Sequence, residues 1–121
     1  MAINGATPQD TESIIFGSGA STYHWWKDWE KVGWDYDEKV LAPDDWVWRV
    51  TAQGEDGTVV KDIRHADIMR AARNIPDKEL GAGESVRTEA RNIVFNVDEC
   101  DADAWIADAI LQVAVFGKVV Y

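Results

Sequence analysis

The chain has 121 residues, of which 46% are hydrophobic and 28% charged, and its 22 acidic and 12 basic side chains give a net charge of −10. This composition predicts one folded domain and excludes a disordered chain, and the excess of carboxylates disfavours direct binding to nucleic acid or anionic lipid. No apolar run approaches the roughly 18 residues that span a bilayer, and residues 1–10 lack the features of a secretory signal. We therefore expect a cytoplasmic protein that makes no contact with membranes.

The first part of the chain is expected to be irregular. Residues 1–10 are mostly small or polar, so we predict a flexible leader there, followed by a single domain over 11–121. The segment 13–16 is short, apolar and β-branched, which favours a first strand. The small residues of 17–21 then predict a turn.

The segment 22–36 holds four of the seven tryptophans. Trp25, Trp26 and Trp29 have the spacing of a helix face, whereas Trp26 and Trp34 belong to an alternating pattern typical of a strand. Because aromatic and β-branched residues favour strands, we predict a strand here and keep the helix as the alternative.

The next signals predict a hairpin and then helices. Apolar residues alternate over 46–52, and a four-residue loop at 54–57 leads into a second strand. Apolar stripes with helical spacing follow over 68–75, 86–97 and 105–116.

Two breaker residues mark helix ends in this half of the chain. Pro76 terminates the first stripe, and Gly117 is placed to end the third helix in a left-handed conformation. Strands followed by helices predict an α+β fold, in which an antiparallel sheet of three to four strands from the N-terminal half packs against three amphipathic helices from the C-terminal half.

No set of residues in the sequence points to catalysis or to a cofactor. Cys100 stands among carboxylates, which raise a thiol pKa, so we interpret it as a structural thiol. The segment 96–103 resembles a calcium loop but lacks the required glycine and final glutamate. We expect no metal there and favour capping of the third helix by Asp101 or Asp103.

Three further features have structural interpretations. His24 and His65 have no serine or cysteine partner at a recognisable spacing, so we expect hydrogen-bonding roles. The loop 17–22 lacks the lysine and the glycine order of phosphate-binding loops. Four cations lie within thirteen residues and are interpreted as solvated positions on a helix, with a small basic patch as the alternative: Lys61, Arg64, Arg70 and Arg73.

The tryptophan-rich region has two interpretations. The indoles either fill the core, or some of them form an exposed binding patch. The stretch 28–45 contains seven acidic residues against Lys31 and Lys39, so exposed rings would have a negative rim. The residues of this predicted binding site are Trp25, Trp26, Trp29, Trp34, Asp28, Glu30, Asp35 and Asp37.

Three segments together resemble a group of small acidic proteins encoded by bacteriophages of actinobacteria. These segments are 17–26 (GSGASTYHWW), 65–73 (HADIMRAAR) and 101–121, which includes LQVAVFG. The resemblance covers most of residues 13–121 and implies a phage accessory protein in the cytoplasm of the infected host cell. It brings no catalytic residues with it.

Our leading hypothesis is a non-enzymatic protein that binds a host or phage protein through an acidic, tryptophan-rich surface. Inhibition of a nucleic-acid-binding or defence protein is one form of it, because carboxylates can occupy a groove built for phosphates. One alternative is a small-molecule binder, for a nucleotide signal as an example, with a tryptophan-lined pocket near the glycine loop. Another is a minor virion or assembly protein. A homodimer through a strand edge or tryptophan patch stays open.

Overall fold

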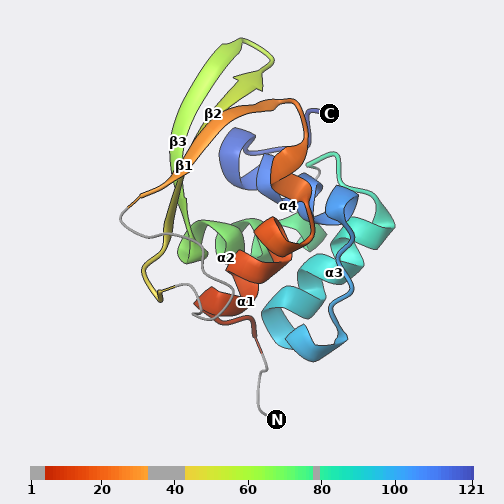
Figure 1. Cartoon of the computed structure of the whole chain (residues 1–121). Helices are drawn as coiled ribbons and strands as arrows, with labels where there is room; N and C mark the ends of the chain where they lie inside the picture. The colour runs from red at the N-terminus through yellow and green to blue at the C-terminus, as the bar shows by residue number, and fades with distance from the viewer. Residues whose placement is uncertain (1–4, 33–42, 78–79) are drawn as a thin grey trace.

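The computed structural model describes residues 5–32, 43–77 and 80–121. Its sheet contains β1 (Trp26–Lys31), β2 (Val47–Gly54) and β3 (Gly57–Arg64), all antiparallel and in the order β1-β2-β3. Figure 1 shows the three strands arching over the helices. This confirms the predicted antiparallel sheet in the N-terminal half.

The β2–β3 hairpin is tighter than the predicted four-residue loop. Gly54 pairs with Gly57, so only Glu55 and Asp56 connect the strands. Gly57 has a backbone φ of +126°, which residues with a side chain rarely adopt. This glycine therefore allows the chain to reverse at that point.

The two faces of the sheet differ sharply. In β2, Trp48 and Val50 are buried on the inner face, whereas Arg49 between them is exposed on the outer face. In β1 a bulge follows Trp26, and it places both Trp26 and Trp29 on the inner face. The alternation expected across 22–36 is therefore interrupted, although its described part does contain the predicted strand.

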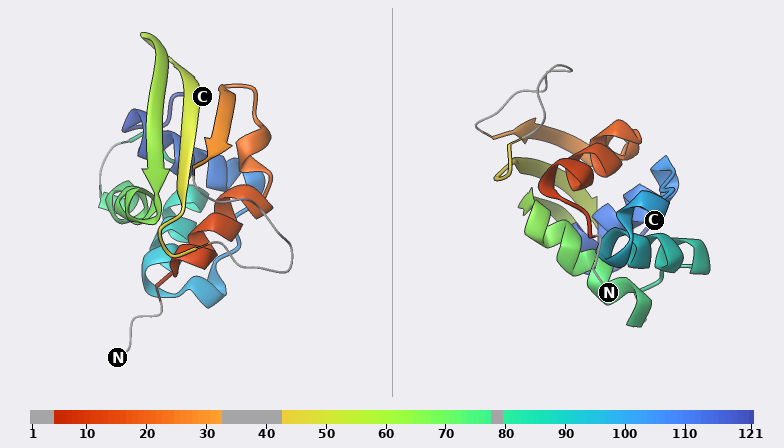
Figure 2. Two further views of the ribbon diagram at one scale, coloured as in Figure 1. Left: turned by 60° about the vertical axis from the view of Figure 1, so that its left-hand side comes forward. Right: turned by 90° about the horizontal axis from the view of Figure 1, so that it is seen from below.

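All the main helices lie on one side of the sheet (Figure 2). They are α2 (His65–Asn74), α3 (Glu84–Phe95) and α4 (Ala104–Phe116), which confirms the three predicted helices of the C-terminal half. A 3₁₀ turn, Ile75–Asp77, follows α2 at the predicted proline break. Gly117 has φ +83° and ends α4 as expected.

Helix α4 is more deeply buried than an amphipathic stripe predicts. Every residue from Ile106 to Val113 is buried, because α4 contacts α2, α3 and β3 at once. An apolar helix in the middle of a domain has no face left for solvent. None of the helices in the described ranges is long and apolar enough to cross a bilayer.

The strand predicted at 13–16 is wrong. The chain instead forms α1 (Pro8–Glu12), which continues directly into a π-helical turn, Ser13–Gly17. A short apolar run fits a buried helix as well as a strand, and here the packing of buried Ile15 decides between them.

Residues 5–10 also differ from the flexible leader that we predicted. Thr7 and Asp10 form a capping box at the start of α1, and Pro8 occupies its first turn. Ala6 is buried, and its backbone N–H donates to the carbonyl of Ile93, 2.8 Å away. This segment is therefore part of the packed structure.

A continuous set of aromatic rings joins the two halves of the core. Phe16 contacts Trp46 and Trp48 edge to face, at centroid distances of 6.0 and 5.3 Å. Trp26 contacts Trp48 at 5.8 Å and stacks on Phe116 of α4 at 5.6 Å. These contacts hold β1 and β2 against both the N-terminal segment and the C-terminal helix.

Candidate functional site

The residues of the predicted binding site do not share one surface. Trp26 is buried beneath the sheet, and Trp29 is 38% exposed at its edge. Asp28 and Glu30 pair with the outward residues of β2, on the opposite face of the sheet. Three further predicted residues lie outside the described ranges: Trp34, Asp35 and Asp37.

The outer face uses one of the predicted carboxylates in an ion network across three strands. Arg49 Nε donates to Asp62 Oδ1 at 2.8 Å, and Arg49 Nη1 lies 3.6 Å from Glu30 Oε1. The hydrogen bond from Arg49 lowers the pKa of Asp62. These groups are exposed, so the network contributes little to stability.

Two of the predicted tryptophans converge instead on a carboxyl group of α4. Trp25 Nε1 and Trp26 Nε1 donate to Asp108 Oδ1 at 3.0 and 2.7 Å. Gln112 Nε2 donates to Asp108 Oδ2 at 2.7 Å. The Asp108 carboxyl group thus accepts three hydrogen bonds, in a residue that is only 3% exposed.

The charge of Asp108 has no counter-ion among the described residues. Its donors are two indoles and an amide, all neutral, and no described ion pair involves it. Burial raises the pKa of Asp108, while the hydrogen bonds from Gln112, Trp25 and Trp26 oppose that rise. The hydrogen bonds to this buried carboxyl group therefore come from neutral groups alone.

The C-terminal residues close over this network. The backbone N–H groups of Val120 and Tyr121 both donate to Gln112 Oε1 at 2.8 Å. The Trp25 ring is stacked between Tyr23 and Tyr121, at centroid distances of 4.9 and 4.7 Å. The Tyr121 hydroxyl donates to the Gln53 carbonyl, which fixes the outer ring of the stack to β2.

A hollow of about 250 Å³ opens beside Asp108, and we call it the Asp108 pocket. Trp105, which is 53% exposed, lines it together with Asp108 and Gln112, because positions i, i+3 and i+7 share one face of α4. The full lining consists of Tyr23, Trp25, Gly81, Ala82, Gly83, Val86, Trp105, Asp108, Ala109, Gln112, Val119 and Tyr121, without lysine or arginine.

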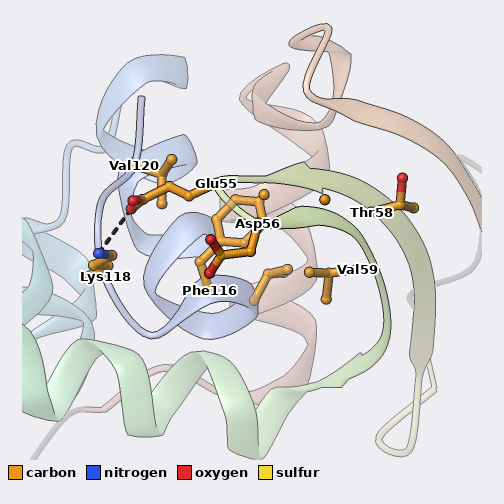
Figure 3. Close-up of a pocket in the computed structure, with 10 residues that line it drawn as sticks. Glu55, Asp56, Thr58, Val59, Phe116, Lys118 and Val120 are labelled. Atoms are coloured by element: carbon orange, nitrogen blue, oxygen red, sulfur yellow. Dashed lines mark ion pairs between the residues drawn. The ribbon is translucent and has the colours of Figure 1, made fainter.

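A second hollow lies at the tip of the β2–β3 hairpin (Figure 3). It measures about 280 Å³ and is lined by the connection between the strands and the end of α4. Lys118 Nζ forms an ion pair with Glu55 Oε1 at 2.8 Å across it. Its lysine is thus already paired, Asp56 adds a second carboxylate to the lining, and none of the predicted site residues lines it.

A third hollow, of about 290 Å³, lies next to the glycine loop and is lined by Phe16, Trp29, Lys31 and Glu12, among others. Burial raises the pKa of Glu12, and the nearby charge of Lys31 opposes that rise. Lys31 Nζ also lies 5.8 Å from the centroid of the Phe16 ring. This carboxyl already has a cation beside it, in contrast to Asp108.

Two other candidates from the sequence have structural roles. His65 Nδ1 lies 2.9 Å from Thr11 Oγ1, in agreement with the expected hydrogen-bonding role, and burial lowers the pKa of His65. Burial, together with the charge of Glu89, raises the pKa of Cys100 to about 11, which makes its thiol a poor nucleophile.

The capping prediction was right in position and wrong in mechanism. Asp103 occupies the N-cap of α4, but its side chain makes no capping hydrogen bond. Asp101 instead donates its backbone N–H to Glu89 Oε2 at 3.3 Å. Within the described ranges, no group of three or more His, Cys, Asp or Glu side chains is arranged to hold a metal ion.

Sequence reasoning missed Asp108, Trp105, Tyr23 and Tyr121. One signal was present, because Asp108 stands in the middle of the apolar run of the third helix. A carboxylate at such a position is almost never fully buried without partners. The partners themselves, Trp25 and Trp26, are 83 and 82 residues away and could not be identified from spacing.

No protein-family model, curated protein or solved structure matches this chain. The resemblance to phage proteins therefore stays a prediction, and the site is interpreted from its geometry alone.

Proposed function

We propose that this protein is a non-enzymatic binding protein whose ligand is a small organic cation held in the Asp108 pocket. One observation carries the proposal. Asp108 is buried, its hydrogen-bond donors are all neutral, and it lines an aromatic pocket that contains no lysine or arginine.

A cationic ligand would satisfy both features of the pocket. A charge placed beside Asp108 would offset the unfavourable burial of the carboxylate. Alkyl groups around that charge would contact the rings at the rim, where Trp105 is the most exposed. Ammonium groups are attracted to tryptophan and tyrosine faces, and more strongly when they are desolvated.

The same geometry argues against the nucleotide that we gave as an example of a ligand. A phosphate in the pocket would face the Asp108 carboxylate with no cation in the lining. The third hollow offers Lys31, but Glu12 lines it as well. A compact, positively charged ligand with little polar surface suits the Asp108 pocket better.

Binding is favoured over catalysis because the carboxyl oxygens are already occupied. Asp108 Oδ1 accepts two hydrogen bonds and Oδ2 accepts one, so these donors hold the buried carboxyl group in one orientation. A general base must lie within hydrogen-bond reach of the proton that it takes from a substrate. This network instead fixes the charge in place.

The broader expectations stay predictions. A small-ligand site is compatible with each of them: a host or phage protein as partner, a homodimer, a virion role, and action as a phage accessory protein in the host cytoplasm. The acidic, tryptophan-rich surface has weaker support, because Trp26 and Asp28 lie on opposite faces of the sheet.

Thermal denaturation with matched ligands tests the proposal. Choline carries a trimethylammonium group, and its uncharged analogue replaces that group with tert-butyl at almost the same size. A ligand at about 100 times its Kd adds about 2.7 kcal/mol to the free energy of unfolding. We expect choline or a related ammonium ion to raise the melting temperature and the neutral analogue to leave it unchanged. Equal effects of both, or none across a series of ammonium ions, would refute the proposal.

Two tryptophan variants give the matched control. Trp105→Leu removes an exposed ring from the pocket, whereas Trp29→Leu removes an exposed ring from the edge of the sheet. We expect Trp105→Leu to abolish the ligand-dependent shift and Trp29→Leu to preserve it. Loss of the shift in both variants would place the ligand elsewhere.

A further inference from the structure

A large apolar hollow lies between α2 and α3, on a part of the molecule separate from the Asp108 pocket. We call this hollow of about 680 Å³ the α2–α3 groove. Met69 and Ala72 of α2 form one wall, and Val94 and Phe95 of α3 form the other. The two helices pack against each other, and Figure 2 shows them side by side.

One of the apolar walls of the groove carries an exposed ring. Phe95 is 58% exposed, although it lies at the end of a helix whose Val86, Ala90 and Ile93 are buried in the core. A large ring left in water next to an apolar hollow is typical of a surface that a partner covers. The ring can therefore act as an anchor for binding.

The rim of the groove carries positive charge, whereas the net charge of the chain is negative. Arg73 of α2 and Arg91 of α3 both line it and are exposed. Neither forms an ion pair with another residue of the described ranges. In a chain of net charge −10, two free guanidinium groups beside a phenylalanine form a local cationic and apolar surface.

From these observations we infer that the α2–α3 groove binds an amphipathic, acidic helix of a protein partner. A groove between two packed helices accepts the apolar ridge of a third helix, whose apolar residues recur at i, i+3, i+4 and i+7. Carboxylates beside that ridge would reach Arg73 and Arg91, and arginine forms favourable bidentate bonds with them.

Charge complementarity distinguishes this partner from two other occupants. A second copy of the chain would bring another net charge of −10, so repulsion between the copies disfavours a dimer through this groove. A nucleic acid would be attracted by the arginines but would gain little from Phe95, Met69 and the other apolar groups between them.

Two synthetic helical peptides of about 16 residues test the inference by fluorescence anisotropy. Both carry leucine at the anchor positions, and one has glutamate and the other lysine beside them. We expect the acidic peptide to bind, more weakly as salt rises, and the basic peptide to bind at least about tenfold more weakly. Equal binding of the two peptides, or none of the acidic one, would overturn the inference.

Variants locate the binding surface. Arg73→Glu and Arg91→Glu should each weaken binding of the acidic peptide about fivefold, and Phe95→Ser should weaken it about tenfold. Lys27→Glu makes the same change of charge on exposed β1 and should have no effect. Circular dichroism checks that each variant is folded. Unchanged binding in all three groove variants would refute the assignment.

The alternative occupants are outcomes of the same experiment. Arg91→Glu should leave the sedimentation of the free protein unchanged, and a dimer that Arg91→Glu dissociates would assign the groove to a second copy. Competition by single-stranded DNA should be absent. Displacement of the acidic peptide by DNA, lost in Arg73→Glu, would assign the groove to nucleic acid instead.

Discussion

Neighbouring residues of one strand have different roles on the inner and outer faces of the sheet. On the inner face, Trp26 and Trp48 contact each other and the helices, and Trp26 holds Asp108. On the outer face, Glu30 and Asp62 flank Arg49 in water. Rings and charges that are adjacent in sequence are thus separated by the thickness of the sheet. Local composition alone therefore overstates how much of a surface is both acidic and aromatic.

The largest effect should come from the inner face. Trp48→Ala removes a fully buried indole from the central strand and should lower the free energy of unfolding by about 3 to 5 kcal/mol, measured by urea denaturation. Trp48→Phe should cost much less, because the indole Nε1 that it removes has no hydrogen-bond partner among the described residues. A phenylalanine variant as unstable as the alanine variant would contradict this description of the core.

A smaller loss is expected at the network that joins the sheet to α4. Asp108→Ala leaves the indole N–H groups of Trp25 and Trp26 without their acceptor, which should cost about 2 to 3 kcal/mol. Asp103→Ala, in the same helix, removes a carboxylate that makes no capping bond and should be nearly neutral in urea denaturation. Similar losses in both variants would mean that the network contributes nothing specific.

The pH dependence of stability should identify the titration of Asp108. Because the pKa of Asp108 is raised on folding, its stabilising contribution is complete below the unfolded value of about 3.9 and is lost as the pH rises through the folded pKa. The free energy of unfolding of the wild type relative to Asp108→Asn should therefore decrease as the pH rises above about 4. A relative increase over this range would contradict a raised pKa.

The smallest effect should come from the outer face. Arg49→Ala breaks the contacts with Glu30 and Asp62, but all these groups are exposed, and water replaces the lost interactions. We expect its melting temperature to stay close to that of Lys27→Ala, a control elsewhere on the sheet, and any difference to vanish in high salt. A loss comparable to that of Asp108→Ala would contradict the distinction between the faces.

The parts of the fold that the sequence predicts well have strong local signals. The β2–β3 hairpin follows from strict alternation around paired glycines, and the end of α4 follows from Gly117 after an apolar stripe. The start of α1 had a local signal as well, in the capping box of Thr7 and Asp10 with Pro8 between them.

The remaining features depend on contacts that no local pattern contains. The bulge in β1 moves the chain by one residue, and one residue is enough to exchange the faces of a strand. The Asp108 pocket requires β1, α4 and the C-terminal residues to meet, through bonds such as that from Trp26 to Asp108. An ion pair on the outer face, such as Glu30 with Arg49, likewise needs the register of the strands.

An NMR titration with choline tests the central claim most directly, because each of the seven tryptophans carries an indole N–H that reports on its own surroundings. We predict saturable shifts of the Trp25, Trp26 and Trp105 signals, no shift of the buried Trp46 signal, and no response to the uncharged tert-butyl analogue. If the signals of Trp25, Trp26 and Trp105 stay unchanged with choline and with every other ammonium ion tested, the Asp108 pocket does not bind organic cations.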